Sequence, residues 1–330
     1  MSRTLQRLLL VAFTLALPWL LTSTYDRHLL VMAGVFVLMA LGFDMVVGYL
    51  GEISLGHAAF FGLGGYATAF LTRELGLPFI ADLLLASALT GLCGFLIGYP
   101  ALRLKGPYFA IATFGFAEIL RLVALNWTSV TRGPMGLPDI PAASLRFPPF
   151  IDFTFKTEVH YYYLVLFLVY VAIFITHRLL RSTVGQAFLA IRENEELALA
   201  VGIPTFRFKL IAFSTGMMFT GAAGSVYAHY VHFIDPTALS FYYTYTVIAM
   251  VIVGGQGSIR GTVIGAILFS LLPEYLRAAE LYRLPVFGIL IILCVIFMPE
   301  GINGLINRVM PEGINGLINR VLKRGTHETA

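Results

Sequence analysis

The sequence predicts an all-α polytopic membrane protein with about ten (8–10) transmembrane helices and with both termini on the inner side of the membrane. Composition is the first reason, because 58% of the 330 residues are hydrophobic, only 12% are charged and the mean hydropathy is +0.84. Ordinary soluble domains carry about 25% charged residues. The second reason is a series of long apolar segments, and the third is one long polar segment, 177–209, that interrupts the series.

The apolar segments are mostly about 17–25 residues long, which is enough to cross ~30 Å of hydrocarbon. The first one has a basic start and resembles a signal peptide, but no A-x-A-like cleavage site follows it, so we expect an uncleaved helix. The last three are short, so broken or re-entrant helices would reduce the count to eight. The predicted spans are 8–24, 29–48, 54–72, 79–100, 108–126, 160–177, 207–229, 240–255, 261–276 and 284–298.

The loops indicate the orientation of the chain. With the N-terminus inside, most of the 22 Lys and Arg residues fall in inner loops, as the positive-inside rule requires. Aromatic residues then fall at the outer boundaries, where Trp and Tyr are typically enriched. These residues are Trp127, Tyr161, Tyr162, Tyr163, Tyr242 and Tyr243. The polar segment 177–209 is consequently cytoplasmic, and the longest outer loop is 127–159.

The outer loop 127–159 contains five prolines. Proline fixes φ and has no backbone N–H to donate, so we expect the loop to be ordered by local restriction and not by regular hydrogen bonding. The loop could contact a soluble partner, act as a gate or simply connect two helices, and all three interpretations stay open.

The polar segment predicts two short helices. Ser182 or Thr183 can cap the first, which carries apolar residues at helical spacing up to Glu193. Asn194 can cap the second, whose first turn holds two glutamates that the helix dipole stabilises. Gly202 and a following proline end it. A capped pair with mixed charge suits a docking surface, although an ordinary loop on the lipid headgroups fits as well.

Two stretches combine glycine with polar residues at the ends of predicted spans, at 48–70 and 254–266. Glycine lets helix backbones approach closely and weakens helix continuity. Interrupted helices in both halves of a chain are typical of a central transport pathway, but tight helix packing alone explains the glycines equally well. The candidate pathway residues are Ser54, Gly56, His57, Phe60, Gly64, Tyr66, Thr113 and Glu118.

Two further polar groups have alternative explanations. Glu118 and Arg121 lie three residues apart on one helix face, so they form either part of the pathway or a structural ion pair. His229, His232 and Asp235 could suit a metal ion, but an interface loop explains them better because nothing completes a tetrahedral ligand set.

The sequence excludes several functional classes. It has no basic face with interleaved aromatics, so we expect no nucleic-acid partner. Cys93 and Cys294 lie inside apolar segments, where cysteine behaves as a small hydrophobic residue. The chain contains no G-x-x-x-x-G-K-[ST] phosphate-binding loop, no G-x-S-x-G nucleophile elbow and no H-E-x-x-H motif. We therefore expect no catalytic residue, metal or cofactor in this chain.

Four ordered motifs carry a resemblance to a known family. They are GEISLGHAAFFGLGGYATAFL, GPYFAIATFGFAEILRLV followed by NWTSVTRGPMGL, STVGQAFLAIRENEELALAVGI, and VIVGGQGSIRGTVIGAILF. Together, over about residues 29–300, they resemble permease subunits of branched-chain amino acid ABC importers of the LivM type. The resemblance implies a multi-pass protein of the bacterial inner membrane without its own ATPase. It also implies a second permease subunit of the LivH type, two ATP-binding cassette subunits that use ATP and Mg, and a periplasmic substrate-binding protein.

The same resemblance implies that the polar segment, 178–209, is the coupling segment that contacts the ATPase. The residues it implicates are Arg192, Glu193, Glu195, Glu196, Ala198 and Gly202. Leu, Ile and Val as substrates follow from the resemblance only, and related permeases carry urea or short amides.

An ion-coupled secondary transporter is the main alternative function. It would need acidic groups within the membrane, for which Asp44, Glu118 and Glu274 are the candidates. An ATP requirement for uptake separates the two classes. A membrane enzyme is disfavoured because no set of nucleophile, base and oxyanion donors can be assembled from the sequence.

The chain divides into a transmembrane permease domain, 1–303, and a cytoplasmic tail, 304–330. The tail contains most of an identical tandem repeat, because MPEGINGLINRV at 298–309 recurs at 310–321. A shift of twelve residues turns a helix by about 120°, so the two apolar sets cannot form one stripe. We interpret the repeat as a duplication without function.

Deleting residues 310–321 should therefore leave uptake unchanged, as measured with radiolabelled substrate at equal protein level. Deleting residues 183–194 removes the same length of chain from the coupling segment and should abolish uptake. A transport defect in the first deletion would show that the duplication has a function.

Overall fold

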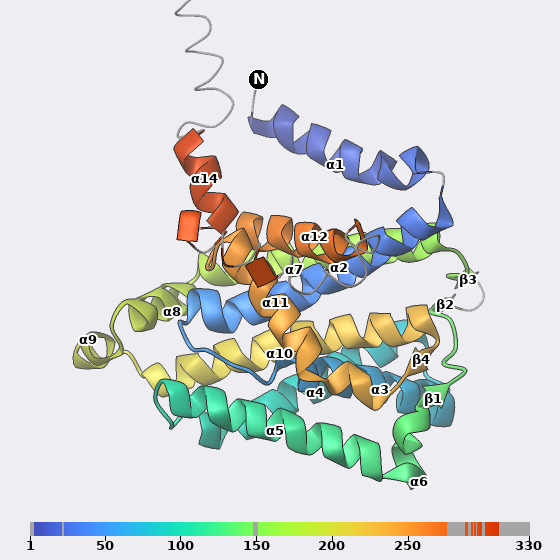
Figure 1. Ribbon diagram of the computed structural model, residues 1–330, viewed down its shortest axis with the longest axis horizontal. Coiled ribbons are helices and arrows are strands. Elements are labelled where there is room, and N and C mark those ends of the chain that lie inside the picture. Colours follow the sequence, from blue (N-terminus) through green and yellow to red (C-terminus); the bar gives the residue numbers. More distant parts are fainter. Residues whose placement is uncertain are drawn as a thin grey trace, which may run out of the picture.

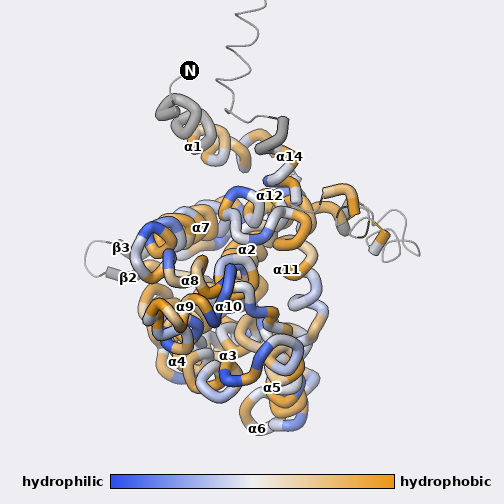
Figure 2. The backbone as a smooth tube through the Cα atoms, turned by 90° about the vertical axis from the view of Figure 1, so that its left-hand side faces the viewer, coloured by the Kyte–Doolittle hydropathy of each residue, from blue (hydrophilic) through white to orange (hydrophobic). Residues whose placement is uncertain are grey.

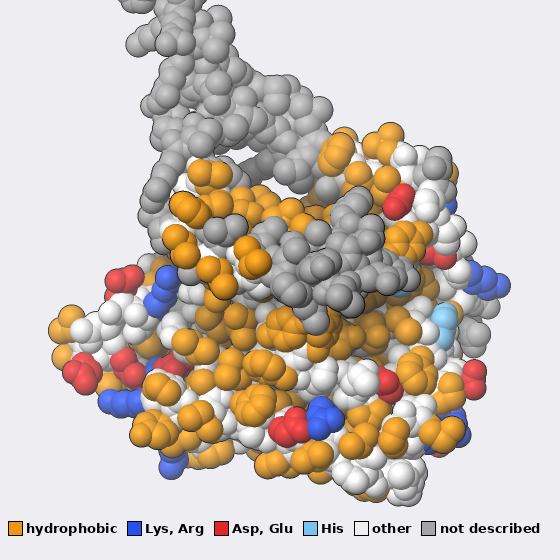
Figure 3. All heavy atoms as spheres, viewed as in Figure 1, with side chains coloured by type: hydrophobic (Ala, Val, Ile, Leu, Met, Phe, Trp, Pro, Cys, Tyr) orange, Lys and Arg blue, Asp and Glu red, His pale blue; other side chains and the backbone are white. Residues whose placement is uncertain are grey.

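The structure is a computed structural model that describes residues 3–21, 23–147, 151–275, 288–289, 292, 294, 296–298 and 301–309. Most long helices run side by side along the longest axis of the molecule (Figure 1). Hydrophobic side chains cover the middle of the face shown in Figure 3, whereas acidic and basic side chains lie mostly toward its two ends. This distribution is the one expected of a protein that crosses a bilayer.

The described helices are α1 Arg3–Leu20, α2 Thr24–Asp44, α3 His57–Leu75, α4 Phe79–Ala101, α5 Pro107–Asn126, α6 Thr128–Thr131, α7 Glu158–Leu180, α8 Thr183–Glu193, α9 Glu195–Ala200, α10 Thr205–Val231, α11 Phe241–Gly254, α12 Ile259–Tyr275 and α14 Gly301–Val309. A π-helix, Met45–Tyr49, continues α2, and 3₁₀ turns occupy Gly133–Met135 and Pro236–Leu239. The short strands are β1 Leu137–Pro138, β2 Ser144–Phe147, β3 Ile151–Thr154 and β4 Phe233–Ile234.

The predicted spans between residues 8 and 276 each coincide with a helix, whereas the last one, 284–298, lies largely outside the described residues. Five described helices are both long and apolar enough to cross a membrane: α2 with its π-helix, α4, α5, α7 and α10. Shorter apolar helices lie in α1, α11 and α12. The all-α polytopic class is thus confirmed, while the number of crossings and the inner position of both termini stay predictions.

Helix α10 lies at the centre of the bundle, in contact with α2, α3 and α4 (Figure 2). Its glycines allow this closeness, because a Cβ atom at Gly221 or Gly224 would collide with the facing helix. Gly224 lies against the backbone carbonyl of Phe61 on α3, and Gly221 against Thr90 on α4. Lipid tails are as apolar as leucine, so membrane helices associate through such small-residue packing and not through the hydrophobic effect.

The outer loop corrects one expectation. Segment 127–159 contains regular hydrogen bonding after all, since β2 and β3 form an antiparallel pair and β1 pairs with β4 after α10. The prediction failed because Pro148 and Pro149 fall between β2 and β3 in the sequence, and because Pro138 lies in the short strand β1 of a two-stranded pair, where proline is tolerated.

Two histidines hold this outer loop against the end of α10. His229 Nε2 lies 2.8 Å from Oδ2 of Asp82 on α4, and its Nδ1 lies 2.7 Å from the carbonyl oxygen of Pro141. His232 Nδ1 lies 2.8 Å from the carbonyl oxygen of Ile140. The structure thus places His229 in the last turn of α10 and His232 at its C-cap, while their position at a membrane interface stays a prediction. Among the residues that the structure describes, no group of three or more His, Cys, Asp or Glu could hold a metal ion.

The substitution Gly224→Ala should lower the stability of the bundle, because the new methyl group meets the Phe61 backbone and α10 must move away from α3. Overpacking of this kind typically costs about 1–3 kcal/mol. The control is Gly115→Ala on α5, where a Cβ atom meets nothing within 4 Å. Thermal unfolding of the purified protein in mild detergent measures both, and equal midpoints would contradict the close packing of α3 and α10.

Candidate functional site

The helices α8 and α9 lie together at one end of the bundle, on the left in Figure 1. Their boundaries match the predicted ones. Ser182 is the residue before α8, but its hydroxyl donates to the Leu179 carbonyl at 2.6 Å and does not cap the helix, whereas Oδ1 of Asn194, the N-cap of α9, accepts a hydrogen bond from the Leu197 N–H at 3.0 Å. The chain leaves α9 through Gly202, whose φ of 87° is a left-handed conformation that glycine adopts without strain.

One face of this helix pair is buried against the membrane domain. Phe188, Ile191 and Ala198 are at most 4% exposed and pack with residues of the π-helix and of α10, including Met45 and Ala212. The pair therefore rests on the ends of the membrane helices, so that a displacement of α8 and α9 bears directly on them.

The opposite face is exposed and unusually apolar for a protein end. Leu197, Leu199 and Val201 are 64%, 53% and 77% exposed, and they stand beside the exposed Glu193 and Glu196. Exposed apolar side chains such as the neighbouring Leu197 and Val201 are typical of a surface that a protein or a membrane covers.

A lysine joins this surface to the first glycine-rich stretch. Lys209 Nζ on α10 lies 2.7 Å from Oε2 of Glu195 on α9 and also contacts Oε1 of Glu52, in the segment before α3. The Lys209 side chain is only 5% exposed, whereas those of Glu52 and Glu195 are 15% and 30% exposed. The bridge thus connects α9, α10 and the start of α3 where water is largely excluded.

An arginine connects the same surface to both glycine-rich stretches. Arg192, at the end of α8, donates from Nη1 to the carbonyl oxygen of Gly48 at 2.6 Å. Gly257 lies beside the same guanidinium group, since a Cβ atom there would be 2.6 Å from Nη1. The backbone N–H of Gly257 in turn donates to Oδ1 of Asp44 at 2.8 Å, and the hydroxyl of Thr262 donates to Oδ2 at 2.8 Å.

From the sequence, Asp44 was only a candidate for ion coupling, and no individual role was predicted for Lys209 or Glu52. In the structure both carboxylate oxygens of Asp44 accept hydrogen bonds from the second glycine-rich stretch and the start of α12. The sequence could have indicated the role of Asp44, because a charged residue inside a long apolar span needs partners and so marks a functional contact.

Four of the predicted pathway residues meet at the start of α3. The Thr113 hydroxyl of α5 accepts a hydrogen bond from the Leu55 N–H at 3.0 Å, and Gly56 lies against the Thr113 carbonyl. Ser54 and His57 are fully buried, and the Ser54 hydroxyl has no hydrogen-bond partner among the described residues. Buried polar atoms are usually paired, so the Ser54 hydroxyl is an exception within the packed start of α3.

The other four predicted pathway residues lie elsewhere. Phe60 packs against Phe116 and Phe213, and Gly64 lies against the α10 backbone. The Tyr66 hydroxyl is buried without a partner among the described residues. Glu118 forms an ion pair with Arg121 and is 39% exposed, so it lies on the outer surface of α5. The predicted ion pair is thus confirmed.

Comparison with known proteins places this chain in a family. A family profile described as "branched-chain amino acid transport system / permease component" matches residues 27–297. The chain belongs to this family. The LivM permease protein of the high-affinity branched-chain amino acid transport system of Escherichia coli K12 is 34% identical over 317 residues, which cover 90% of this chain and 75% of that protein.

Two more distant relatives are also permeases. The probable LivM protein of Methanocaldococcus jannaschii is 24% identical over 82% of this chain and 90% of its own length. The LivH permease protein of Escherichia coli K12 is 27% identical over 82% of this chain and 91% of its own length. No solved structure matches this chain. The permease is therefore related to both the LivM and the LivH types.

Replacing Lys209 by methionine should destabilise the permease, because Glu52 and Glu195 would face each other without the cation between them. Removing one partner of a buried ion pair costs about 3–5 kcal/mol, and the partial exposure of Glu195 favours the lower value. The measurement is thermal unfolding in mild detergent, with the exposed Lys105→Met as control. If the two variants unfold at the same temperature, the bridge contributes nothing to holding α9.

Proposed function

We propose that this permease is the LivM-type subunit of an ATP-driven importer that carries branched-chain amino acids into the cell. The observation that supports this best is the α8–α9 surface. Its inner side is bonded to the first glycine-rich stretch, by Arg192 to Gly48 and by the Glu195–Lys209–Glu52 bridge, while Leu197 and Val201 are exposed. A surface of this kind suits a motor protein that docks from the cytosol and moves the membrane helices.

The mechanism follows from these contacts. Closure of an ATP-bound cassette dimer would push α8 and α9 as a rigid body, because their inner face is packed against the membrane domain. Arg192 would transmit this displacement to Gly48 and Gly257, and Lys209 would transmit it to α10 and Glu52. The membrane helices then shift between outward and inward openings only if the cassettes contact the two states differently.

The proposed assembly contains partners for ATP hydrolysis, for completing the pathway and for substrate delivery. Two ATP-binding cassette subunits hydrolyse ATP with Mg, a second permease of the LivH type completes the pathway, and a periplasmic binding protein delivers substrate. The permease itself binds no cofactor and spans the bacterial inner membrane with both termini and segment 178–209 in the cytosol. Leu, Ile and Val are the proposed substrates, in line with the names of the relatives.

Purification of the tagged permease in mild detergent, with identification of the proteins that accompany it, tests the assembly. We expect a LivH-type permease and a protein with the G-x-x-x-x-G-K-[ST] motif. Recovery without any such protein, together with uptake driven by an ion gradient in the absence of ATP, would favour the secondary transporter instead.

The double variant Leu197→Ser/Val201→Ser should lose the ATP-binding subunit while the permease stays inserted and folded. An interface residue that matters costs more than about 1 kcal/mol when it is truncated, so the two changes together should weaken association at least about tenfold. Glu196→Lys should give a similar loss, because Glu196 is exposed and has no ion pair among the residues that the structure describes, whereas Glu195→Lys would also break the bond to Lys209.

The control is Glu74→Lys, an exposed glutamate at the end of α3 away from α8 and α9. Quantitative recovery of the ATP-binding subunit measures all the variants. Full recovery with the serine double variant would contradict docking at α9.

A further inference from the structure

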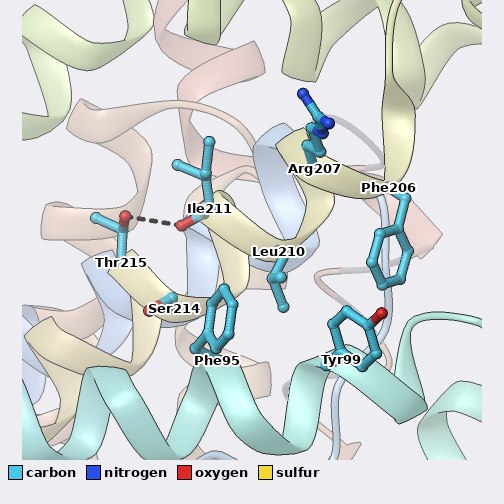
Figure 4. Close-up of a pocket in the computed structure, with 8 residues that line it drawn as sticks. All are labelled: Phe95, Tyr99, Phe206, Arg207, Leu210, Ile211, Ser214 and Thr215. Atoms are coloured by element: carbon cyan, nitrogen blue, oxygen red, sulfur yellow. Dashed lines mark hydrogen bonds between the residues drawn. The ribbon is translucent and has the colours of Figure 1, made fainter.

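A groove of about 550 Å³ lies between α4 and the first turns of α10, outside the site described above (Figure 4). Its walls are apolar, with Phe95 and Tyr99 on α4 facing Leu210 and Ile211 on α10. Phe95, Tyr99 and Ile211 are 45%, 47% and 43% exposed, so the groove opens to the outside of the bundle. At the end nearest α9, the rings of Tyr99 and Phe206 meet edge to face at 5.4 Å.

Two arginines stand at that aromatic end. Arg207 lines the groove, and the guanidinium carbon of Arg103 lies 4.7 Å from the centre of the Tyr99 ring and 5.9 Å from that of Phe206. Both arginines are exposed, and neither forms an ion pair within the part of the chain that the structure describes. The groove therefore has a positive mouth and an apolar body.

We propose that this groove binds one anionic phospholipid from the leaflet on the α8–α9 side. The phosphate lies between Arg103 and Arg207, and one acyl chain follows the apolar walls toward Thr215. From Phe206 to Thr215 the helix rises about 13 Å, close to the ~15 Å of hydrocarbon in one leaflet. Basic pockets between membrane helices at the cytoplasmic boundary bind anionic headgroups in this way.

Charge complementarity favours a lipid over a helix of a partner subunit. A partner helix seated here would have to supply carboxylates to two guanidinium groups and also fill an apolar slot. A phospholipid provides both features in one molecule, and its phosphate can accept hydrogen bonds from either arginine. A soluble anion would satisfy the arginines but would leave the apolar walls uncovered.

Native mass spectrometry of the intact, delipidated importer complex tests the proposal. The complex is titrated with phosphatidylglycerol or with phosphatidylcholine of the same acyl chains. A basic residue near an anionic lipid surface contributes about fivefold in affinity, so the two arginines should favour phosphatidylglycerol by roughly 25-fold. Arg103→Gln/Arg207→Gln should remove this preference, whereas the control Arg178→Gln/Arg181→Gln, on cytoplasmic arginines outside the groove, should keep it.

A second variant tests the acyl chain separately from the charge. Ile211→Trp places a larger side chain in the groove at an exposed position, so it should weaken binding of both lipids. Three results would overturn the proposal: a preference unchanged in Arg103→Gln/Arg207→Gln, displacement of phosphatidylglycerol by equimolar inorganic phosphate, or efficient cross-linking of Ile211→Cys to another subunit.

Discussion

The buried carboxylate of Asp44 is the contact on which the α8–α9 end of the structure depends. Asp44 is fully buried, and an unpaired carboxylate at such a place would cost several kcal/mol. Its two hydrogen-bond donors, the Gly257 N–H and the Thr262 hydroxyl, come from the other half of the chain. The carboxylate therefore fixes the second glycine-rich stretch against the end of α2.

The π-helix that ends α2 begins directly after Asp44. Single-turn π-helices are rare and occur frequently at functional sites. A helix end leaves its last carbonyl groups without partners, and Arg192 takes one of them, that of Gly48. The π-helix, Asp44 and Arg192 thus belong to one hydrogen-bonded arrangement. Arg192 donates to a carbonyl of the π-helix, and Asp44 accepts from Gly257 and Thr262.

Local chemistry in the sequence predicted the helices well and their contacts poorly. The bounds of α9 were predictable because Asn194 and Gly202 act on their immediate neighbours. The bond from Lys209 to Glu52 joins positions 157 residues apart, and no local pattern specifies such a partner. Gly64 was a pathway candidate because it lies in a glycine-rich stretch. In the structure it lies against the backbone of α10, a contact that the local sequence does not specify.

Helix α10 has 27 residues and a length of about 40 Å. Near its first turn, Lys209 connects it to α9, and near its last turn, His229 and His232 connect it to the outer loop. A rod of this length that tilts by about 5° around its middle moves each end by roughly 2 Å. A single helix therefore joins the α8–α9 end of the bundle to the loop at its other end, so that an event at either end would bias the same tilt. By the reciprocity of linked equilibria, each event then alters the affinity of the other.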